Sequence, residues 1–294
     1  MYKSAFYISK PLQYFNATNI EDPNEKVCII VDHFSGAREL YEKLLNRNSQ
    51  WNQIIFVPNP KAAYVWMQEN SKEIDRIYID SDVGVLKNIW LYPLRRKQII
   101  VYEEGLGSYR SDLRPRKALD LVVEFLLNIV GIRSFFGGSV FTNAIYLYDH
   151  DSHKKNNPSY QKARLHFKRN FLEHLNHFED KNLFLDEESY LVIEQACAKK
   201  VILYLTSWQY NSAVEHIIND YPGYMKLIKP HPHIKSSFSQ HLNMFHFVVG
   251  NAVMVEFLLL ELAKVAEKVV VLHENSSAMH YFSNLAHVEN RIFR

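Results

Sequence analysis

Three short loops carry side chains that could do chemistry, and each directly follows a predicted strand. The first loop contains two adjacent carboxylates, Glu103 and Glu104, followed by Gly105. Adjacent carboxylates repel each other, so one of them can acquire a raised pKa and serve as a general base. Gly105 lets the backbone turn tightly and approach a ligand. The alternative interpretation of this pair is a solvated turn.

The second loop reads Lys229-Pro230-His231-Pro232-His233. The prolines restrict the backbone around His231 and so hold its imidazole with little conformational freedom. Beside Lys229, His231 could bind a phosphate or protonate a leaving group. A purely structural loop is the alternative, and a metal site built on His231 and His233 would need a third ligand from elsewhere.

The third loop places two hydroxyls, Ser276 and Ser277, between a predicted strand and a helix-like stretch. Serine at the start of a helix caps it, and the free N–H groups at the same place can bind an anion. Capping and phosphate binding therefore both remain open for this pair.

A regular alternation of apolar runs and helix-like stretches must position these loops. Such an alternation is typical of parallel α/β sheets, whose carboxyl edge binds ligands. The expected strands are 4–9, 27–31, 53–57, 76–79, 98–102, 201–205, 224–228, 245–249 and 268–272, with helices expected at 37–45, 121–132 and 252–263.

The alternation stops in the middle of the chain and then restarts, which predicts two lobes. A polar stretch after Asp149 reads as a linker, and residues 163–200 read as helical. We expect an N-terminal Rossmann-like, acceptor-side lobe over residues 1–155, a helical connector over 156–200 and a C-terminal nucleotide-sugar-binding lobe over 201–294. Two such lobes create a cleft, where all three loops could open toward one substrate.

Composition excludes several classes of protein. The formal net charge of +2 over 294 residues is too balanced for a protein that grips nucleic acid through its phosphates. Two cysteines without a CxxC pattern suit a reducing compartment, and neither a secretory signal nor an apolar run long enough to span a bilayer is visible. We therefore expect a cytoplasmic protein.

Familiar phosphate and metal motifs are also missing from the sequence. It has no GxGxxG and no P-loop. The only DxD match, Asp80-Ser81-Asp82, lies away from the loops of the second lobe and reads as a turn. The sequence thus predicts neither a cofactor nor a metal.

The combination of Glu103–Gly105, Lys229–Pro232 and the Ser276-Ser277 pair resembles the acidic-acidic-Gly, His-Pro and Ser-Ser/Thr motifs of bacterial sialyltransferases. These are the lipooligosaccharide type (glycosyltransferase family 52) and the related polysialic acid capsule type (family 38). The opening segment Tyr7–Ala17 is similar to the strand-then-PLQ start of those proteins. Motif order and spacing agree over nearly the whole chain.

The resemblance implies a GT-B fold, two Rossmann-like lobes that use CMP-sialic acid without a metal. By position, Glu103 matches the general base that deprotonates the glycan acceptor, and His231 matches the histidine on the CMP phosphate. Ser276 and Ser277 match the pair that binds this phosphate, and Glu256 resembles a carboxylate that holds the ribose. Read from the sequence alone, Glu256 could equally be a helix N-terminal charge.

The sequence departs from the family pattern in two places. The first acidic residue is glutamate where many relatives have aspartate, which leaves open whether Glu103 or Glu104 is the base. The loop Thr206–Asn211 lacks the carboxylate that some relatives carry there. CMP-Kdo or a nucleotide-hexose also remains open as the donor, because donor choice depends on the shape of a pocket that these motifs do not encode. The sequence also leaves open a non-catalytic nucleotide- or glycan-binding module and a metal-dependent hydrolase using His231, His233 and Glu274.

Basic residues flank the first loop on both sides. They are Arg95, Arg96, Lys97, Arg110, Arg114, Arg116 and Lys117. Such a cluster could draw an anionic acceptor, such as lipooligosaccharide or capsule, or the anionic inner leaflet of the membrane, and a solvated surface is the alternative. Peripheral membrane association is thus an expectation, and a homodimer is expected by analogy with relatives.

Overall fold

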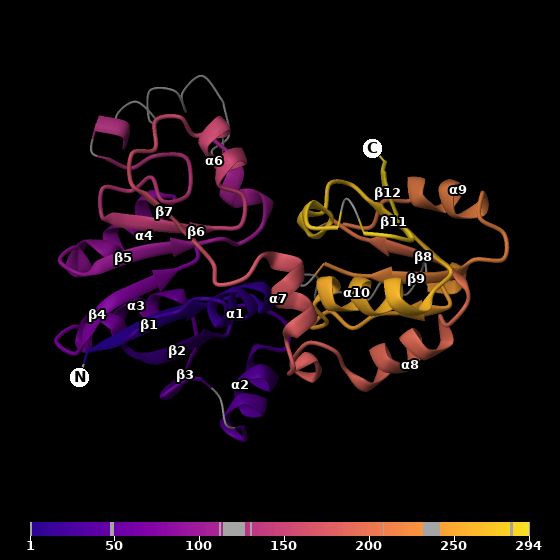
Figure 1. Ribbon diagram of the computed structural model, residues 1–294, viewed down its shortest axis with the longest axis horizontal. Helices are drawn as coiled ribbons and strands as arrows, with labels where there is room; N and C mark the ends of the chain where they lie inside the picture. Colours follow the sequence, from indigo (N-terminus) through magenta and orange to yellow (C-terminus); the bar gives the residue numbers. More distant parts are fainter. Residues whose placement is uncertain are drawn as a thin grey trace. The chain divides into compact units, whose positions relative to one another are not determined.

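The computed structural model describes residues 2–47, 50–111, 113, 127–129, 131–207, 209–231, 242–282 and 285–293 (Figure 1). The chain divides into two compact units. The first comprises Met1–His33 and Ala37–Asn170, and the second comprises Phe34–Gly36 and Phe171–Arg294. Each unit contains its own parallel sheet.

The first unit is built on a seven-stranded parallel sheet of order β3-β2-β1-β4-β5-β6-β7. Its strands are β1 (Lys3–Ile8), β2 (Glu25–Val31), β3 (Gln53–Val57), β4 (Ile74–Ile79), β5 (Gln98–Tyr102), β6 (Thr142–Leu147) and β7 (Ala163–His166). Its α-helices are α1 (Pro11–Thr18), α2 (Ala37–Leu45), α3 (Pro60–Glu69), α4 (Val85–Leu91) and α6 (His150–Asn156), with 3₁₀ turns η1 (Tyr92–Leu94) and η2 (Leu106–Tyr109).

Both faces of this sheet are covered by helices. On one face, Tyr7 of β1 packs against Tyr64 of α3, with ring centroids 5.7 Å apart. On the other face, Phe6 packs against Trp51, whose ring in turn contacts Tyr14 of α1. Burial on both sides explains why the central strands read as continuous apolar runs.

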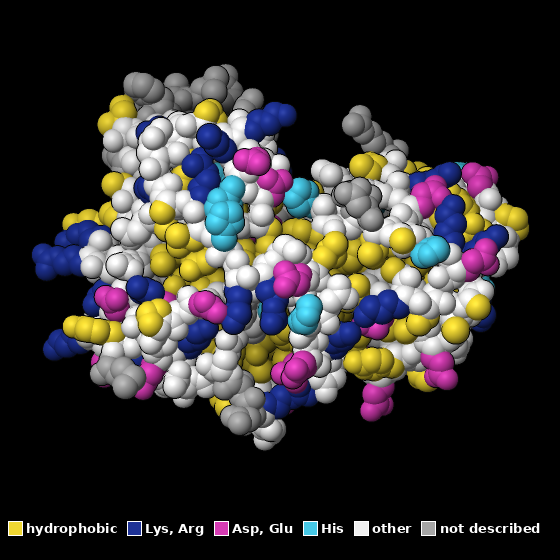
Figure 2. Space-filling model, viewed as in Figure 1, with side chains coloured by type: hydrophobic (Ala, Val, Ile, Leu, Met, Phe, Trp, Pro, Cys, Tyr) yellow, Lys and Arg dark blue, Asp and Glu magenta, His cyan; other side chains and the backbone are white. Residues whose placement is uncertain are grey.

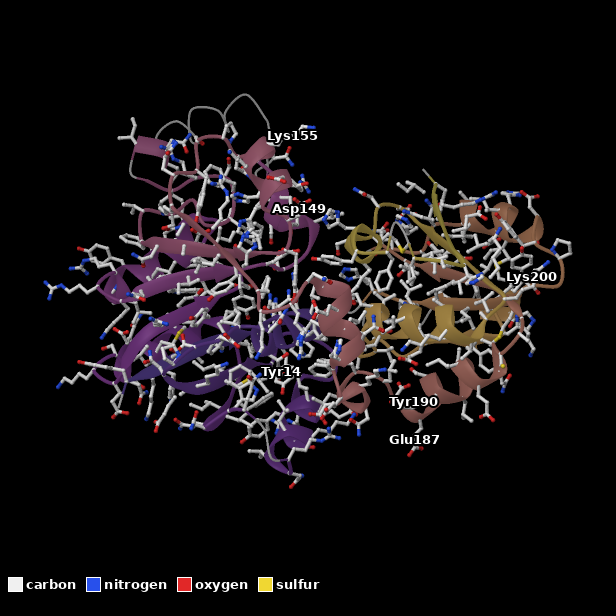
Figure 3. The ribbon with its side chains drawn as sticks, viewed as in Figure 1. Tyr14, Asp149, Lys155, Glu187, Tyr190 and Lys200 are labelled. Carbon is white, nitrogen blue, oxygen red and sulfur yellow. The ribbon has the colours of Figure 1, made fainter. Side chains whose placement is uncertain are left out.

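Side-chain caps fix where the helices of this unit begin. Asn59 accepts a hydrogen bond from the Ala62 N–H at 3.0 Å at the start of α3, and Pro60 occupies the first helical turn. Asp149 accepts one from the Ser152 N–H at 2.9 Å at the start of α6 (Figure 3). The prediction that the polar stretch after Asp149 is a linker is therefore wrong in part, because α6 begins there with Asp149 as its cap.

The second unit has a five-stranded parallel sheet of order β10-β9-β8-β11-β12. Its strands are β8 (Lys200–Leu205), β9 (Met225–Lys229), β10 (Phe247–Val248), β11 (Lys268–His273) and β12 (Val288–Ile292). Its helices are α7 (Phe171–His177), α8 (Glu187–Gln195), α9 (Ala213–Asn219) and α10 (Val255–Val265), with 3₁₀ turns η3 (Lys181–Leu183), η4 (Leu242–Met244) and η5 (Ser277–His280). Ile202 and Tyr204 of β8 pack with Val214 and Ile218 of α9 in one buried cluster.

Most of the predicted elements are confirmed. The expected strands all occur, as do the helices at 37–45 and 252–263, with ends shifted by a few residues and β10 reduced to two residues. The expected helix over 121–132 falls mainly outside the described residues.

The middle of the chain differs from expectation. The first unit runs on to Asn170 instead of ending at 155, because β7 pairs in parallel with β6 and so belongs to the first sheet. The region 163–200 was expected to be helical but opens with this strand. The strands β6, β7 and β12 escaped prediction, the last two because edge strands such as ARLH and VENRI carry charged residues instead of apolar runs.

Candidate active site

The two adjacent glutamates of the first loop lie in different environments. Glu103 is fully buried. Its carboxylate accepts hydrogen bonds from the Tyr109 hydroxyl and, at 2.8 Å, from the Tyr148 N–H. Its carbonyl oxygen accepts another from Asn16 of α1 at 2.8 Å. The Glu103 side chain therefore ties β5 to β6 and to η2, and its carboxylate is closed to solvent.

Glu104 points to the carboxyl edge of the sheet and keeps 17% of its side chain exposed. Its Oε2 atom lies 2.9 Å from the Lys10 ammonium group, and its N–H donates to the Ser108 hydroxyl at 2.9 Å. Gly105 follows with φ +107°, a backbone conformation that favours glycine and reverses the chain after the carboxylates. Glu104 is thus the accessible carboxylate of the pair.

The strand order brings two further charged residues to Glu104. β1, β4 and β5 are neighbours in the sheet, so Lys10 after β1 and Asp80 after β4 meet Glu104 after β5. The chain reverses its winding direction between β1 and β4, and open α/β sheets bind ligands at such a switch point. Asp80 is buried and forms an ion pair with Lys87 at 3.0 Å.

The charges of this cluster set the protonation of Glu104. Burial raises the pKa of Glu104 above its ordinary value of 4.5, Lys10 lowers it, and Asp80 raises it further. A carboxyl group with a raised pKa, placed beside a lysine, can accept a proton from a hydroxyl group. Glu104 is therefore a general-base candidate among the described residues of the first unit.

Lys10 and Asp80 were not predicted as site residues, although both directly follow predicted strands. The aspartates of the DxD match have separate roles. Asp82 is buried and accepts hydrogen bonds from the N–H groups of Gly137 and Ser139 and from the Thr142 hydroxyl, at 2.8, 2.7 and 2.6 Å. Asp82 thus holds the loop before β6, and only Asp80 reaches the cluster.

In the second unit, the loops after β8 and β9 are joined. His231 is half-buried, and its N–H donates to the Thr206 hydroxyl at 2.9 Å. Lys229 is buried, and its ammonium group donates to the carbonyl oxygens of Pro230 and Asn251 at 2.8 and 3.3 Å. Lys229 therefore braces the loop from within the protein. Pro232 and His233 lie outside the described residues.

Glu256, in the first turn of α10, is also buried. Burial raises its pKa to about 7, whereas its own backbone N–H and Lys229 act to lower it. Burial lowers the pKa of Lys229 to about 8, against the opposing effects of Glu256 and Asp186. The charge of each residue thus acts on the pKa of the other. Only 5% of Glu256 is exposed to solvent.

The turn after β11 is organised by a buried histidine that sequence analysis did not single out. The Nδ1 atom of His273 accepts hydrogen bonds from the N–H groups of Asn275 and Ser276 at 3.0 and 2.8 Å. Its Nε2 atom bonds to Asn290 of β12. Asn275 adopts φ +108°, an uncommon conformation for a residue other than glycine.

This turn leaves the two serine hydroxyls available. Ser276 is half-buried, Ser277 is exposed, and Ser276 makes no side-chain capping hydrogen bond at the start of η5. β11 neighbours β8 in the sheet, so this turn and Thr206 lie at the same carboxyl edge. The second unit therefore gathers hydroxyl groups at its own switch point, and the loop of His231 is joined to them through Thr206.

The remaining predicted residues are placed as follows. Arg110 is exposed directly after η2, and the basic residues Arg114, Arg116 and Lys117 lie outside the described residues.

Within the described residues, no three His, Cys, Asp or Glu side chains are grouped to hold a metal ion. No described helix is both long and apolar enough to cross a bilayer.

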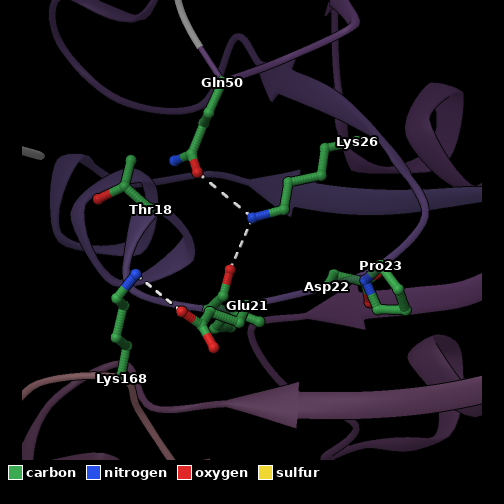
Figure 4. A pocket seen from close by; sticks show the side chains of 8 residues that line it. Thr18, Glu21, Asp22, Pro23, Lys26, Gln50 and Lys168 are labelled. Atoms are coloured by element: carbon green, nitrogen blue, oxygen red, sulfur yellow. Dashed lines mark hydrogen bonds and ion pairs between the residues drawn. The ribbon is translucent and has the colours of Figure 1, made fainter.

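The first unit has a pocket that contains none of the predicted residues. It is lined by Thr18, Ile20, Glu21, Asp22, Pro23, Lys26, Gln50 and Lys168 (Figure 4). Lys168 forms an ion pair with Glu21 at 2.7 Å, and Lys26 donates to the Ile20 carbonyl at 2.6 Å. Its lysines are therefore already engaged within the protein.

A known structure resembles the whole chain. The wall teichoic acid polymerase TagF, in a histidine-to-asparagine variant soaked with CDPG (CDP-glycerol), superposes with a TM-score of 0.56. The sequences are 11% identical, and the match covers 99% of this chain and 69% of the TagF chain. No protein-family model matches the sequence, and no curated protein matches it either.

The two parallel sheets and this likeness define the architecture. The chain has a GT-B fold with two Rossmann-like units, as predicted. At 11% identity the likeness establishes the fold alone. The expectation that the loops of both units open into one cleft stays a prediction, as does the homodimer.

Proposed function

We propose that this protein is a glycosyltransferase that moves a sugar from a cytidine-nucleotide donor, CMP-sialic acid, to a hydroxyl group of a bacterial surface glycan such as lipooligosaccharide or capsule. The observation that carries the proposal is Glu104, an accessible carboxyl group with a raised pKa at the switch point of the first sheet. A transferase of this kind needs one such base to activate its acceptor. The likeness to TagF, a polymerase soaked with CDPG, supports a transferase on this fold.

The proposed mechanism needs only residues of this chain. Glu104 takes the proton of the acceptor hydroxyl as its oxygen attacks the anomeric carbon, and the bond from that carbon to the CMP phosphate oxygen breaks. Charge develops on the departing phosphate, where His231 and the hydroxyls of Ser276 and Ser277 stabilise it. Glu103 and Lys229 position the loops, because both are buried and bonded within the protein.

A second candidate reaction rests on the same likeness. A CDP-linked alcohol could serve as the donor, with the acceptor oxygen attacking phosphorus instead of carbon, and CMP would leave in both reactions. Glu104 would play the same part in each. The two reactions are distinguished by which donor the protein consumes. The same measurement tells whether CMP-Kdo or a nucleotide-hexose is the donor.

The test is CMP release by the purified protein from CMP-sialic acid, and separately from CDP-glycerol, with a bacterial glycan as acceptor. Glu104→Gln should lower turnover by about 10²- to 10⁴-fold, since it removes the base. His231→Ala should also abolish transfer. Glu103→Gln is the matched control and should keep its turnover. The amide oxygen of the new side chain can still accept hydrogen bonds from Tyr109 and Tyr148.

Three results would count against parts of this proposal. Normal turnover in a folded Glu104→Gln protein would overturn the assignment of the base. Loss of activity in Glu103→Gln alone would transfer that role to Glu103. Binding of CMP without turnover of either donor would favour a non-catalytic binding module.

A further inference from the structure

The solvent-facing side of α4 and η1 is apolar. Four large apolar side chains there have exposed fractions between 47% and 60%. They are Val85, Leu86, Ile89 and Tyr92, which we call the α4 apolar face. A helix on the surface of a globular protein normally turns its charged side outward, and exposed apolar groups that cluster in this way mark interaction sites.

Hydrogen bonds fix this orientation of the helix. Asn88 is buried, and its side-chain amide donates to the carbonyl oxygens of Asp82 and Gly84 at 2.7 and 2.8 Å. Leu91 is fully buried in the core of the first unit. Because Asn88 and Leu91 anchor the inner side of α4, the apolar face cannot rotate into the core.

Basic groups border the α4 apolar face. The Arg95 guanidinium lies 4.1 Å from the centroid of the Tyr92 ring and donates to the Tyr92 carbonyl at 2.9 Å. Arg96 follows and is exposed, and Lys97 is half-buried. Residues 83–102 contain no aspartate or glutamate. Figure 2 shows hydrophobic and basic side chains together at the left edge of the view, where Figure 1 places α4 and β5.

The apolar surface continues onto a neighbouring segment. The Tyr92 ring meets the Phe141 ring edge-on, with centroids 6.0 Å apart. The preceding residue, Val140, is 59% exposed. The exposed apolar side chains thus come from two parts of the chain, one of them beside arginines.

We propose that the α4 apolar face, with Arg95 and Arg96, docks this protein onto an anionic lipid surface. Apolar side chains would enter the boundary between headgroups and acyl chains, tyrosine would sit at the headgroup level, and the arginines would pair with lipid phosphates. A second copy of the chain fits less well, because a two-fold interface on this face would bring cations together without acidic partners. This inference does not depend on the proposed transferase activity.

The test is cosedimentation of the full chain with vesicles of phosphatidylcholine alone and with vesicles that also contain phosphatidylglycerol, without nucleotide. The wild type should bind the anionic vesicles and release as salt is raised. The double variant Leu86→Ser/Ile89→Ser should bind at least about tenfold more weakly, since it removes two lipid-facing side chains without changing the charge. Absence of wild-type binding to both vesicles would overturn the proposal.

A matched double variant controls for the loss of apolar surface in general. Leu45 and Ile292 are 53% and 60% exposed, close to the 58% and 60% of Leu86 and Ile89, but lie on α2 and β12. Leu45→Ser/Ile292→Ser should leave vesicle binding unchanged. Equal vesicle binding by the two double variants would contradict the proposal. The proposal would also be contradicted if the wild type were a dimer and only Leu86→Ser/Ile89→Ser converted it to a monomer.

The contribution of charge is tested separately. Arg95→Gln/Arg96→Gln should weaken binding to anionic vesicles, whereas the adjacent exposed pair changed in Lys199→Gln/Lys200→Gln should not. Both variants lower the net charge equally. An equal loss in both would show a general charge effect and would overturn the role of the two arginines.

Discussion

Glu103 and Glu104 show how far neighbouring residues of one type can differ. Both follow the end of β5, but Glu103 is enclosed by Tyr109 and Tyr148, whereas Glu104 lies beside Lys10 and keeps part of its side chain exposed. The buried carboxylate is satisfied by hydroxyl and N–H donors, and the other meets Lys10 and Asp80. Environment, and not residue type, therefore assigns the candidate base.

Removing either neighbour of Glu104 should move the acid limb of the pH–activity profile, and in opposite directions. Protonated Glu104 is inactive as a base, so activity falls as pH falls through its pKa. Lys10→Met removes a cation that lowers this pKa, so the limb should move to higher pH. Asp80→Asn removes an anion that raises it, so the limb should move to lower pH.

Initial rates measured across pH for wild type and both variants check this prediction. Tm values at one pH serve as the control for folding. Movement of the limb in the same direction for both variants, or no movement at all, would show that Glu104 is not the titrating base.

At the scale of elements, the turn after β11 depends on one buried imidazole. His273 holds two backbone N–H groups of the turn, and Asn290 of β12 holds His273. Because Nδ1 accepts both bonds, the ring must be neutral there, and protonation would break them. The position of Ser276 and Ser277 therefore depends on the charge of a residue that need not touch the substrate.

The stability of the protein should fall in mild acid because of His273. Burial lowers its pKa below 6.5, although the bond to Asn290 opposes this effect. Below pH 6.5 the unfolded chain then binds a proton that the folded chain does not, so stability falls as pH falls, by at most about 1.4 kcal/mol per pH unit. His273→Asn should lose less stability than the wild type over the same pH interval.

Urea unfolding at about pH 7.5 and pH 5.5 measures this difference. His216→Asn, at an exposed position on α9, is the control and should behave as the wild type does. An equal acid sensitivity in wild type and His273→Asn would contradict the assignment.

At the scale of the whole molecule, the two units have the same architecture. Each unit is a parallel sheet with polar loops after the strands beside its switch point. The chemistry of the two loop sets differs, with a carboxylate and a lysine in the first unit and an imidazole and hydroxyls in the second. We therefore infer that the first unit binds the acceptor and the second unit binds the nucleotide.

Nucleotide binding should stabilise the protein and protect the second unit. CMP at about 100 times its dissociation constant should add roughly 2.7 kcal/mol to the free energy of unfolding, with or without EDTA. Amide hydrogen exchange should slow in the segments after β8, β9 and β11 and stay unchanged around Glu104. Protection by UDP or GDP instead of CMP would overturn the donor class, and protection confined to the first unit would reverse the assignment of the two units.

The amino-acid sequence was enough to predict the α/β class, nearly all the central strands and the three loops that follow them. This was possible because buried parallel strands are continuous apolar runs, and because polar residues directly after such runs must lie at the carboxyl edge of a sheet. The edge strands β7 and β12 escaped because their solvated, charged residues carry no such signal.

Tertiary contacts, in contrast, set which residues lie together and which are closed to solvent. The strand order β1-β4-β5 joins Lys10, Asp80 and Glu104 from distant parts of the chain, and no local pattern encodes that order. Burial likewise closed Glu103 and Lys229 to solvent, and it placed His273 where its ring accepts hydrogen bonds from the turn after β11. Burial and strand order depend on contacts between residues far apart in sequence, so the spacing of the motifs could not reveal them.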